Sequence, residues 1–226
     1  MFDAPATPRI SKLTTVAALG QDAWRALDPA IGACVLTLVE PDEIVRRRRD
    51  LRKMRHAQIR RELGLVAVPN HGPGLVTTYL PGVPLSQVTS EGPRCAREMV
   101  RIGTEALELL AHAHSRGVVH GRLQKRHLII GESVGLVGFG QTPSGATPQD
   151  DLRALAAILY ECITGEEWNA WAPAASYHRP ELGRAFDDWL AILADPERGF
   201  RDADQMRTAL IAVGATLPPA RSRIAV

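Results

Sequence analysis

A short stretch near the middle of the chain gathers side chains that can carry positive charge. It runs from Val118 to Ile130, and its cationic members are His120, Arg122, Lys125, Arg126 and His127. The group has two chemical interpretations. It could be an anion site that holds a phosphate without a metal ion. Alternatively, Arg122 could pair with a carboxylate while Lys125 and Arg126 face water. We favour the second interpretation, because such charge clusters are often only structural.

The same stretch resembles the catalytic loop of a protein kinase without its catalytic groups. The family pattern is H-R-D-L-x-x-x-N, in which the Asp accepts the proton of the attacking hydroxyl and the Asn binds magnesium. His120 keeps the first position, but Arg122 stands at the Asp position and His127 at the Asn position. Gly138 stands where the family's D-F-G has its magnesium-binding Asp. The resemblance therefore implies that the catalytic base and both metal ligands are missing.

The resemblance is to bacterial Hanks-type Ser/Thr protein kinases and covers roughly residues 13–213. The segment 19–28 resembles the family's first hairpin, but it lacks the glycines that would hold phosphates. Thr37, or Leu38 if the register differs by one residue, stands at the position of the family's nucleotide-binding lysine. Arg47 stands at the position of the glutamate that pairs with that lysine. Both partners of the family's ion pair are therefore absent.

The large lobe carries the closest match. Residues 150–165 resemble its core helix, whose Asp, here Asp151, braces the backbone of the catalytic loop in the family. The resemblance makes His120 and Asp151 structural anchors. Only about ten residues separate Gly140 from Asp150, so the activation segment is severely shortened. Residues 195–200 resemble the family's last inter-helix turn.

The order of these segments predicts an α+β fold, a reduced two-lobe protein-kinase-like fold with a small β-rich N-lobe and a helical C-lobe. Hydrophobic patterns and turn residues predict a helix from residue 41 and strands at 13–19, 23–27, 33–39, 62–68 and 75–79. Further helices are predicted at 93–115, 151–164, 186–193 and 204–213. We expect the N-lobe to span 13–80 and the C-lobe 81–215, with a flexible N-terminus at 1–12 and a disordered tail at 216–226.

Composition narrows the class of protein. The chain has 226 residues, 45% of them hydrophobic, which is enough for a proper core. A formal net charge of +2 gives no global argument for nucleic-acid binding. Three widely spaced cysteines favour reduced thiols over disulfides or a zinc site. The sequence shows no signal peptide and no apolar run long enough to span a membrane. We therefore expect a cytoplasmic protein with no bound metal or cofactor.

Two surface segments are candidates for regulation. Arginines crowd the helix and turn from Arg46 to Arg61, and Arg46, Arg49 and Lys53 are the candidate docking residues for an acidic partner. The alternative is a solvated helix face. The shortened activation segment offers the candidate phosphoacceptors Thr142, Ser144 and Thr147. There the alternative is a simple loop.

Taken together, the residues predict a catalytically inactive pseudokinase, not an enzyme, that serves as a protein-binding scaffold or allosteric regulator and does not bind Mg-ATP. The expected partner is a protein, such as an active kinase or a phosphopeptide-recognition protein. The alternative is a metal-independent nucleotide or small-molecule sensor, or a repurposed transferase. That alternative would use a cationic cleft formed by His120, Arg122 and His127.

Overall fold

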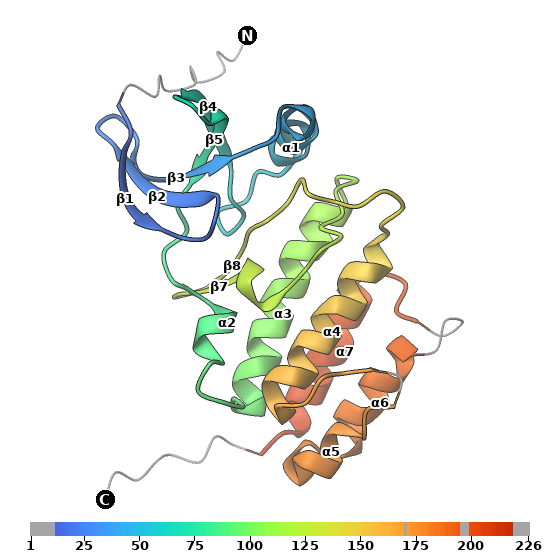
Figure 1. Ribbon diagram of the computed structural model, residues 1–226. Helices are drawn as coiled ribbons and strands as arrows, with labels where there is room; N and C mark the ends of the chain where they lie inside the picture. Colours follow the sequence, from blue (N-terminus) through green and yellow to red (C-terminus); the bar gives the residue numbers. More distant parts are fainter. Residues whose placement is uncertain (1–11, 170, 195–198, 219–226) are drawn as a thin grey trace, which may run out of the picture. The chain divides into compact units, whose positions relative to one another are not determined.

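The computed structural model describes residues 12–169, 171–194 and 199–218, which form two compact units (Figure 1). The first unit holds the described residues up to Pro81 together with Phe139–Gln141, and the second holds the remainder. The chain therefore passes from one unit to the other inside the predicted connector at 80–84.

The first unit is built on a five-stranded antiparallel sheet with strand order β1-β2-β3-β5-β4. The strands are β1 (Thr14–Ala18), β2 (Ala23–Asp28), β3 (Gly32–Leu38), β4 (Glu62–Val68) and β5 (Gly72–Thr78). All five predicted strands are present. The last begins three residues earlier than predicted, because Gly72 to Gly74 pair with the end of β4. One face of the sheet buries a cluster formed by Ala26, Cys34, Leu36, Leu63 and Val76.

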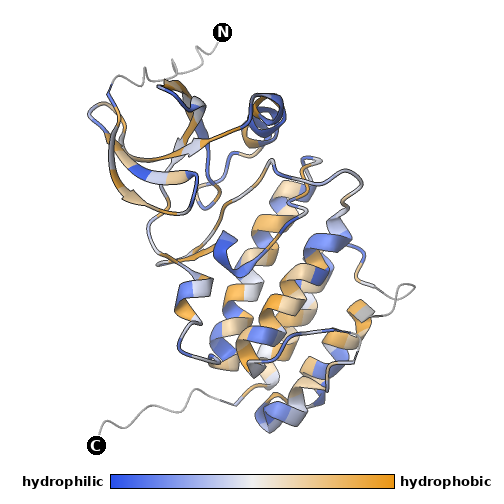
Figure 2. Cartoon of the chain, in the orientation of Figure 1, coloured by the Kyte–Doolittle hydropathy of each residue, from blue (hydrophilic) through white to orange (hydrophobic). Residues whose placement is uncertain are grey.

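Helix α1 (Pro41–Lys53) is the helix of the first unit. Proline at its first position suits a helix start, because that N–H would have no partner within the helix. Asp42 and Glu43 lie in its first turn and Arg52 and Lys53 in its last, as the helix dipole favours. Figure 2 shows α1 almost entirely in hydrophilic colours. Its buried residues are Arg47, Asp50 and Leu51, so only a narrow part of its surface is apolar and buried.

The second unit is mostly helical, as predicted. Its helices are α2 (Leu85–Val88), α3 (Ala96–His114), α4 (Pro148–Thr164), α5 (Ala175–His178), α6 (Gly183–Ala194) and α7 (Ala203–Thr216). Helix α3 packs against α4 and α7, and a Cβ at Gly103 would lie 2.6 Å from a methyl of Leu159. The absence of a side chain at Gly103 therefore permits the close approach of α3 and α4.

Helix α4 starts three residues before the predicted boundary. Thr147 and Asp150 form a capping box in which each side chain accepts a hydrogen bond from the other's backbone N–H. This arrangement satisfies donors that a helix start otherwise leaves free. The helix ends at Gly165, whose φ of 85° is the left-handed conformation that favours glycine at this position.

The second unit also contains a small sheet that the sequence did not predict. It consists of β6 (Val83–Pro84), β7 (Leu128–Ile130) and β8 (Val134–Leu136), with the short helix η1 (Lys125–His127) before β7. These strands have two or three residues, which is too short for a period-two pattern to be visible. Strand β7 begins directly after His127, so the sheet holds the end of the loop that carries His120 and His127.

Two predicted flexible ends are partly described. The backbone N–H of Lys12 donates to Asp28, 3.2 Å away. The prediction of disorder from residue 216 is wrong for its first residues: Thr216 ends α7 and Leu217 is buried. The guanidinium of Arg97 donates to the carbonyl of Leu217, which fixes this end against α3. Residues 1–11, 195–198 and 219–226 lie outside the described residues, and with them most of the predicted inter-helix turn.

Candidate functional site

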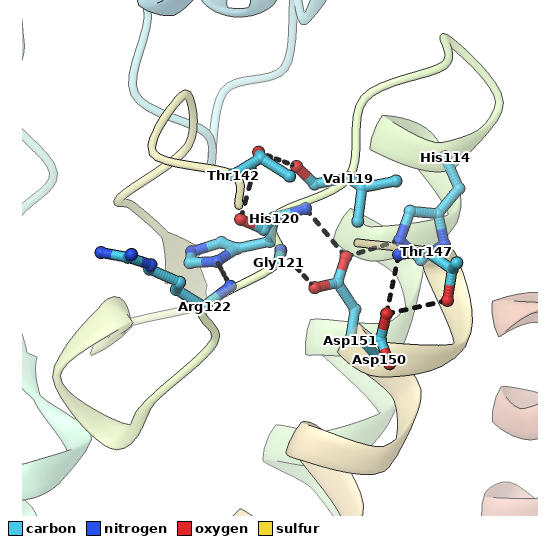
Figure 3. Close-up of polar contacts among 9 residues, drawn as sticks. All are labelled: His114, Val119, His120, Gly121, Arg122, Thr142, Thr147, Asp150 and Asp151. Carbon is cyan, nitrogen blue, oxygen red and sulfur yellow. Dashed lines mark hydrogen bonds and ion pairs between the residues drawn. The ribbon is translucent and has the colours of Figure 1, made fainter. Parts of the chain in front are cut away.

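The carboxylate of Asp151 is the centre of a hydrogen-bond network under the loop at 118–123 (Figure 3). Its Oδ2 accepts from the backbone N–H of His120 at 2.9 Å, and its Oδ1 accepts from the N–H of Gly121 at 2.7 Å. Nε2 of His114, from the end of α3, lies 2.8 Å from Oδ2. Asp151 is fully buried near the start of α4. One carboxylate therefore ties the loop to two long helices.

His120 is completely buried, and both of its ring nitrogens are engaged. Nε2 lies 2.9 Å from the carbonyl of Val137, and Nδ1 lies 3.3 Å from the backbone N–H of Arg122. A carbonyl can only accept, so Nε2 carries the proton and Nδ1 accepts. Burial lowers the pKa of His120. The ring is thus held neutral, and it connects the loop at 118–123 to Val137, which directly follows β8.

We expect this buried histidine to make the protein less stable in mild acid. In the unfolded chain His120 takes up a proton below about pH 6.5, whereas in the folded protein its lowered pKa resists protonation. Its contribution to the free energy of unfolding is therefore lost as pH falls, by up to about 1.4 kcal/mol per pH unit. Urea unfolding at pH 7.5 and pH 5.5 measures this loss. His120→Gln should reduce it, whereas His71→Gln, at an exposed turn, should not.

Gly138 lies against the imidazole rings of His127 and His120. A Cβ at Gly138 would be 2.9 Å from Cδ2 of His127 and 3.2 Å from Nε2 of His120. The backbone there has a φ of 95°, which side-chain-bearing residues rarely adopt. The two rings lie 4.9 Å apart, and both are buried. The space beside the position of the family's magnesium-binding Asp is therefore filled by imidazole.

Arg122 pairs with no carboxylate of a described residue, contrary to the interpretation favoured from the sequence. Its side chain is exposed and, in Figure 3, extends away from Asp151. Within the described part of the chain, no carboxylate lies at ion-pair distance from it. Two nearby acids have other partners: Asp151 holds the loop backbone and Asp150 caps α4. The position of the family's catalytic base thus presents a solvated guanidinium.

Lys125 does not face water as expected. Its Nζ lies 2.6 Å from Oε1 of Glu161, one turn before the end of α4. Both residues line a groove of about 550 Å³ on the second unit, which the sequence analysis missed. Apolar side chains from the loop, from α4 and from the segment after it form part of the lining: Leu123, Ala154, Ala157, Ile158 and Trp168.

Two segments of the first unit stand where the family binds phosphates. Strands β1 and β2 are joined by four residues, and the N–H of Leu19 bonds directly to the carbonyl of Ala23. The connection is a tight turn and offers no glycine-rich cradle. Thr37 lies in the regular part of β3, opposite Leu75 of β5, so a threonine hydroxyl is all that this position supplies.

Arg47 is buried in the first unit, where it contacts the segment Phe139–Gln141. Its guanidinium lies 2.7 Å from Glu43, one helical turn away, and it also donates to the amide oxygen of Gln141. A Cβ at Gly140 would come within 2.7 Å of the Cα of Arg47. The position of the family's lysine-pairing glutamate therefore holds an arginine that fixes the segment after Gly138.

The candidate docking residues of α1 differ in their environments. Lys53 is exposed, and the guanidinium of Arg49 lies 3.2 Å from Asp50. Arg46 is half-buried. Arg48 and Arg52 of the same helix both bind Glu62, at 2.6 and 2.7 Å. Part of the basic run is therefore neutralised inside the unit.

The candidate phosphoacceptors differ in the same way. The hydroxyl of Thr142 donates to the carbonyl of Val119 at 2.6 Å, and the hydroxyl of Thr147 lies 2.9 Å from Asp150 in the capping box. Ser144 is exposed next to Gly145 and makes no such hydrogen bond with a described residue. A phosphate on Ser144 would leave the site intact, whereas one on either threonine would first break a contact.

His114 is the member of the network that the sequence analysis missed. It lies in the last turn of α3, and 37 residues separate it from Asp151. Nothing in the local sequence distinguishes it from the neighbouring His112. Only the packing of α3 against α4 brings its ring to the carboxylate.

Comparison with known proteins supports one conclusion about the architecture. The crystal structure of the PknI kinase domain of Mycobacterium tuberculosis matches 94% of this chain and all of its own length, with a TM-score of 0.73 and 17% sequence identity. The chain has a protein-kinase-like fold. No protein-family model matches the sequence, and no curated protein sequence is significantly similar to it.

The described residues also bear on metal binding and on insertion into a membrane. Among the described residues, no three His, Cys, Asp or Glu side chains are grouped so that they could hold a metal ion. Within the same residues, each helix is too short or too polar to cross a lipid bilayer.

Proposed function

We propose that this protein is a catalytically inactive kinase-like protein whose function is to bind another protein. The observation that carries the proposal is a loop that keeps the backbone support typical of a kinase but lacks the catalytic side chains. Asp151 holds the loop backbone as the family's core helix does, while imidazole rings fill the space beside Gly138. Phosphoryl transfer depends on positioning and on charge neutralisation by magnesium. Neither a base nor an oxygen ligand stands at the expected positions.

Two physical arguments support inactivity. An arginine cannot act as a base at physiological pH, so Arg122 cannot replace the catalytic Asp. Magnesium prefers oxygen ligands in octahedral geometry, which an imidazole and a glycine do not offer. The arrangement also weakens the alternative of a cationic cleft. His120 and His127 are buried against each other, whereas Arg122 is exposed.

We expect Mg-ATP not to stabilise the protein. The tight turn after β1, Thr37, His127 and Gly138 together remove the phosphate and metal contacts of the family. A ligand present at 100 times its Kd would raise the free energy of unfolding by about 2.7 kcal/mol. Thermal denaturation with and without millimolar Mg-ATP measures this, with an active kinase domain as the positive control. A clear upward shift would contradict the proposal and favour a nucleotide sensor.

Affinity capture of the tagged full chain from its native cells, followed by mass spectrometry, tests the binding role. We expect a protein that co-elutes in constant stoichiometry on gel filtration. Recovery of a tightly held small molecule without any protein partner would instead support the sensor or transferase.

A further inference from the structure

Two adjacent hollows lie in the first unit where α1 gives way to β4. The larger, of about 550 Å³, is bordered by the turn after α1 and by the end of β5, and the smaller, of about 320 Å³, lies beside α1 and β4. Arg55 and Arg61 line both hollows. Arg55 and Arg61 thus lie where the two neighbouring hollows meet.

No described residue of the unit neutralises the charges of these two arginines. Glu62, the acid that lines the smaller hollow, is almost fully buried and is held by Arg48 and Arg52. Arg55 and Arg61 are exposed, and no carboxylate of a described residue lies at ion-pair distance from either. Burial lowers the pKa of the neighbouring Arg60 to about 10, which still leaves it charged at neutral pH. The hollows therefore have an uncompensated positive potential.

Buried apolar side chains form part of the lining of both hollows. Ile59 and Leu80 line the larger one, and Leu51 and Leu63 line the smaller one, all of them buried. A ligand that fits must offer carboxylates to the arginines and small apolar side chains to these apolar residues. Arginine suits this task because its planar guanidinium can bind a carboxylate through two parallel hydrogen bonds.

We propose that the hollows shared by Arg55 and Arg61 form the docking site for an acidic segment of a partner protein that alternates carboxylates with apolar side chains. This inference rests on the proposed binding function and moves the docking residues from Arg46, Arg49 and Lys53 to the segment between α1 and β4. Nucleic acid fits less well. Binding of single strands relies on exposed aromatic faces, and Arg25 covers one face of Tyr79 at 4.7 Å.

A direct test is the binding of a dye-labelled peptide EELEELEE to the full chain, measured by fluorescence anisotropy in low salt. We expect Arg55→Glu with Arg61→Glu to weaken binding at least about tenfold, because both charge contacts become repulsive. The control Arg116→Glu with Arg184→Glu makes the same change in net charge at exposed sites of the second unit and should weaken binding less than about twofold. Because all four residues are exposed, thermal midpoints should remain near that of the wild type.

Two further peptides, one triple variant and a DNA octamer complete the test. QQLQQLQQ should bind much more weakly than EELEELEE, and so should EESEESEE, since one lacks the charges and the other the apolar side chains. The triple variant Arg46→Glu, Arg49→Glu and Lys53→Glu should weaken EELEELEE binding less than the double variant does. A larger loss in the triple variant would move the site to the outer face of α1 and overturn the proposal. Equal binding of a single-stranded DNA octamer would overturn it in favour of a general polyanion surface.

Peptide binding and partner capture together distinguish an error in the docking site from an error in the proposed binding function. If the wild type does not bind EELEELEE, the docking site is wrong. If a stoichiometric partner captured from cells stays bound to the double variant, the docking site is again wrong while the binding function stands. If the captured partner is lost from the double variant and kept by the control, both proposals are supported.

Discussion

Replacing Asp151 with alanine is expected to lower the free energy of unfolding by about 3–5 kcal/mol. The change leaves three donors without their acceptor: the N–H groups of His120 and Gly121 and the ring of His114. Each buried donor that loses its partner costs about 1–3 kcal/mol. Because the site is fully buried, water cannot easily replace the carboxylate. Urea denaturation at pH 7.5 measures the loss.

Two matched variants isolate the cause. Asp150→Ala changes the adjacent exposed carboxylate, which caps α4 and lies 3.9 Å from Arg153, and should cost about 1 kcal/mol. Asp151→Asn keeps the size of the side chain but replaces one acceptor oxygen with an NH₂ group that faces donors, so it should still lose a large part of the stability. If Asp151→Ala changed the free energy of unfolding by less than about 1 kcal/mol, the loop would have to be held by other contacts.

Restoring the family's aspartate at position 138 is expected to destabilise the protein instead of creating a metal site. Gly138→Asp must place a Cβ within 2.9 Å of His127, on a backbone with a φ of 95°. The unfavourable backbone conformation costs about 1–2 kcal/mol. Overpacking typically adds about 1–3 kcal/mol. We expect a total loss of about 2–5 kcal/mol, measured by urea denaturation.

Gly145 supplies the control, because it has a φ of 81° but no neighbouring atom where a Cβ would be. Gly145→Asp therefore carries the backbone cost without the clash, and it should lose clearly less stability than Gly138→Asp. His127→Asn shortens the side chain that blocks the position. Combined with Gly138→Asp it should recover part of the loss, with a coupling of at least about 1 kcal/mol. Simple additivity of the two changes would contradict the steric explanation.

The sequence alone determined which chemistry the loop lacks. Side-chain type depends on nothing but the residue, so an arginine at 122, a histidine at 127 and a glycine at 138 exclude a side-chain carboxylate at each of these three positions. The long elements were also predictable, because their hydrophobic periods extend over many residues. The role of Asp151 was predictable only through the resemblance of residues 150–165 to the family's core helix.

The tertiary structure decided how the remaining side chains are used. It turned Arg122 to solvent and paired Lys125 with Glu161. It also placed the His127 ring beside Gly138 and brought His114 to Asp151. The contact between His114 and Asp151 joins residues far apart in the chain. It arises from the packing of α3 on α4, which no local sequence pattern encodes. For the same reason the uncompensated arginines could be located only after Glu62 was seen to bind Arg48 and Arg52. A count of charges in the sequence cannot tell which of them are already paired.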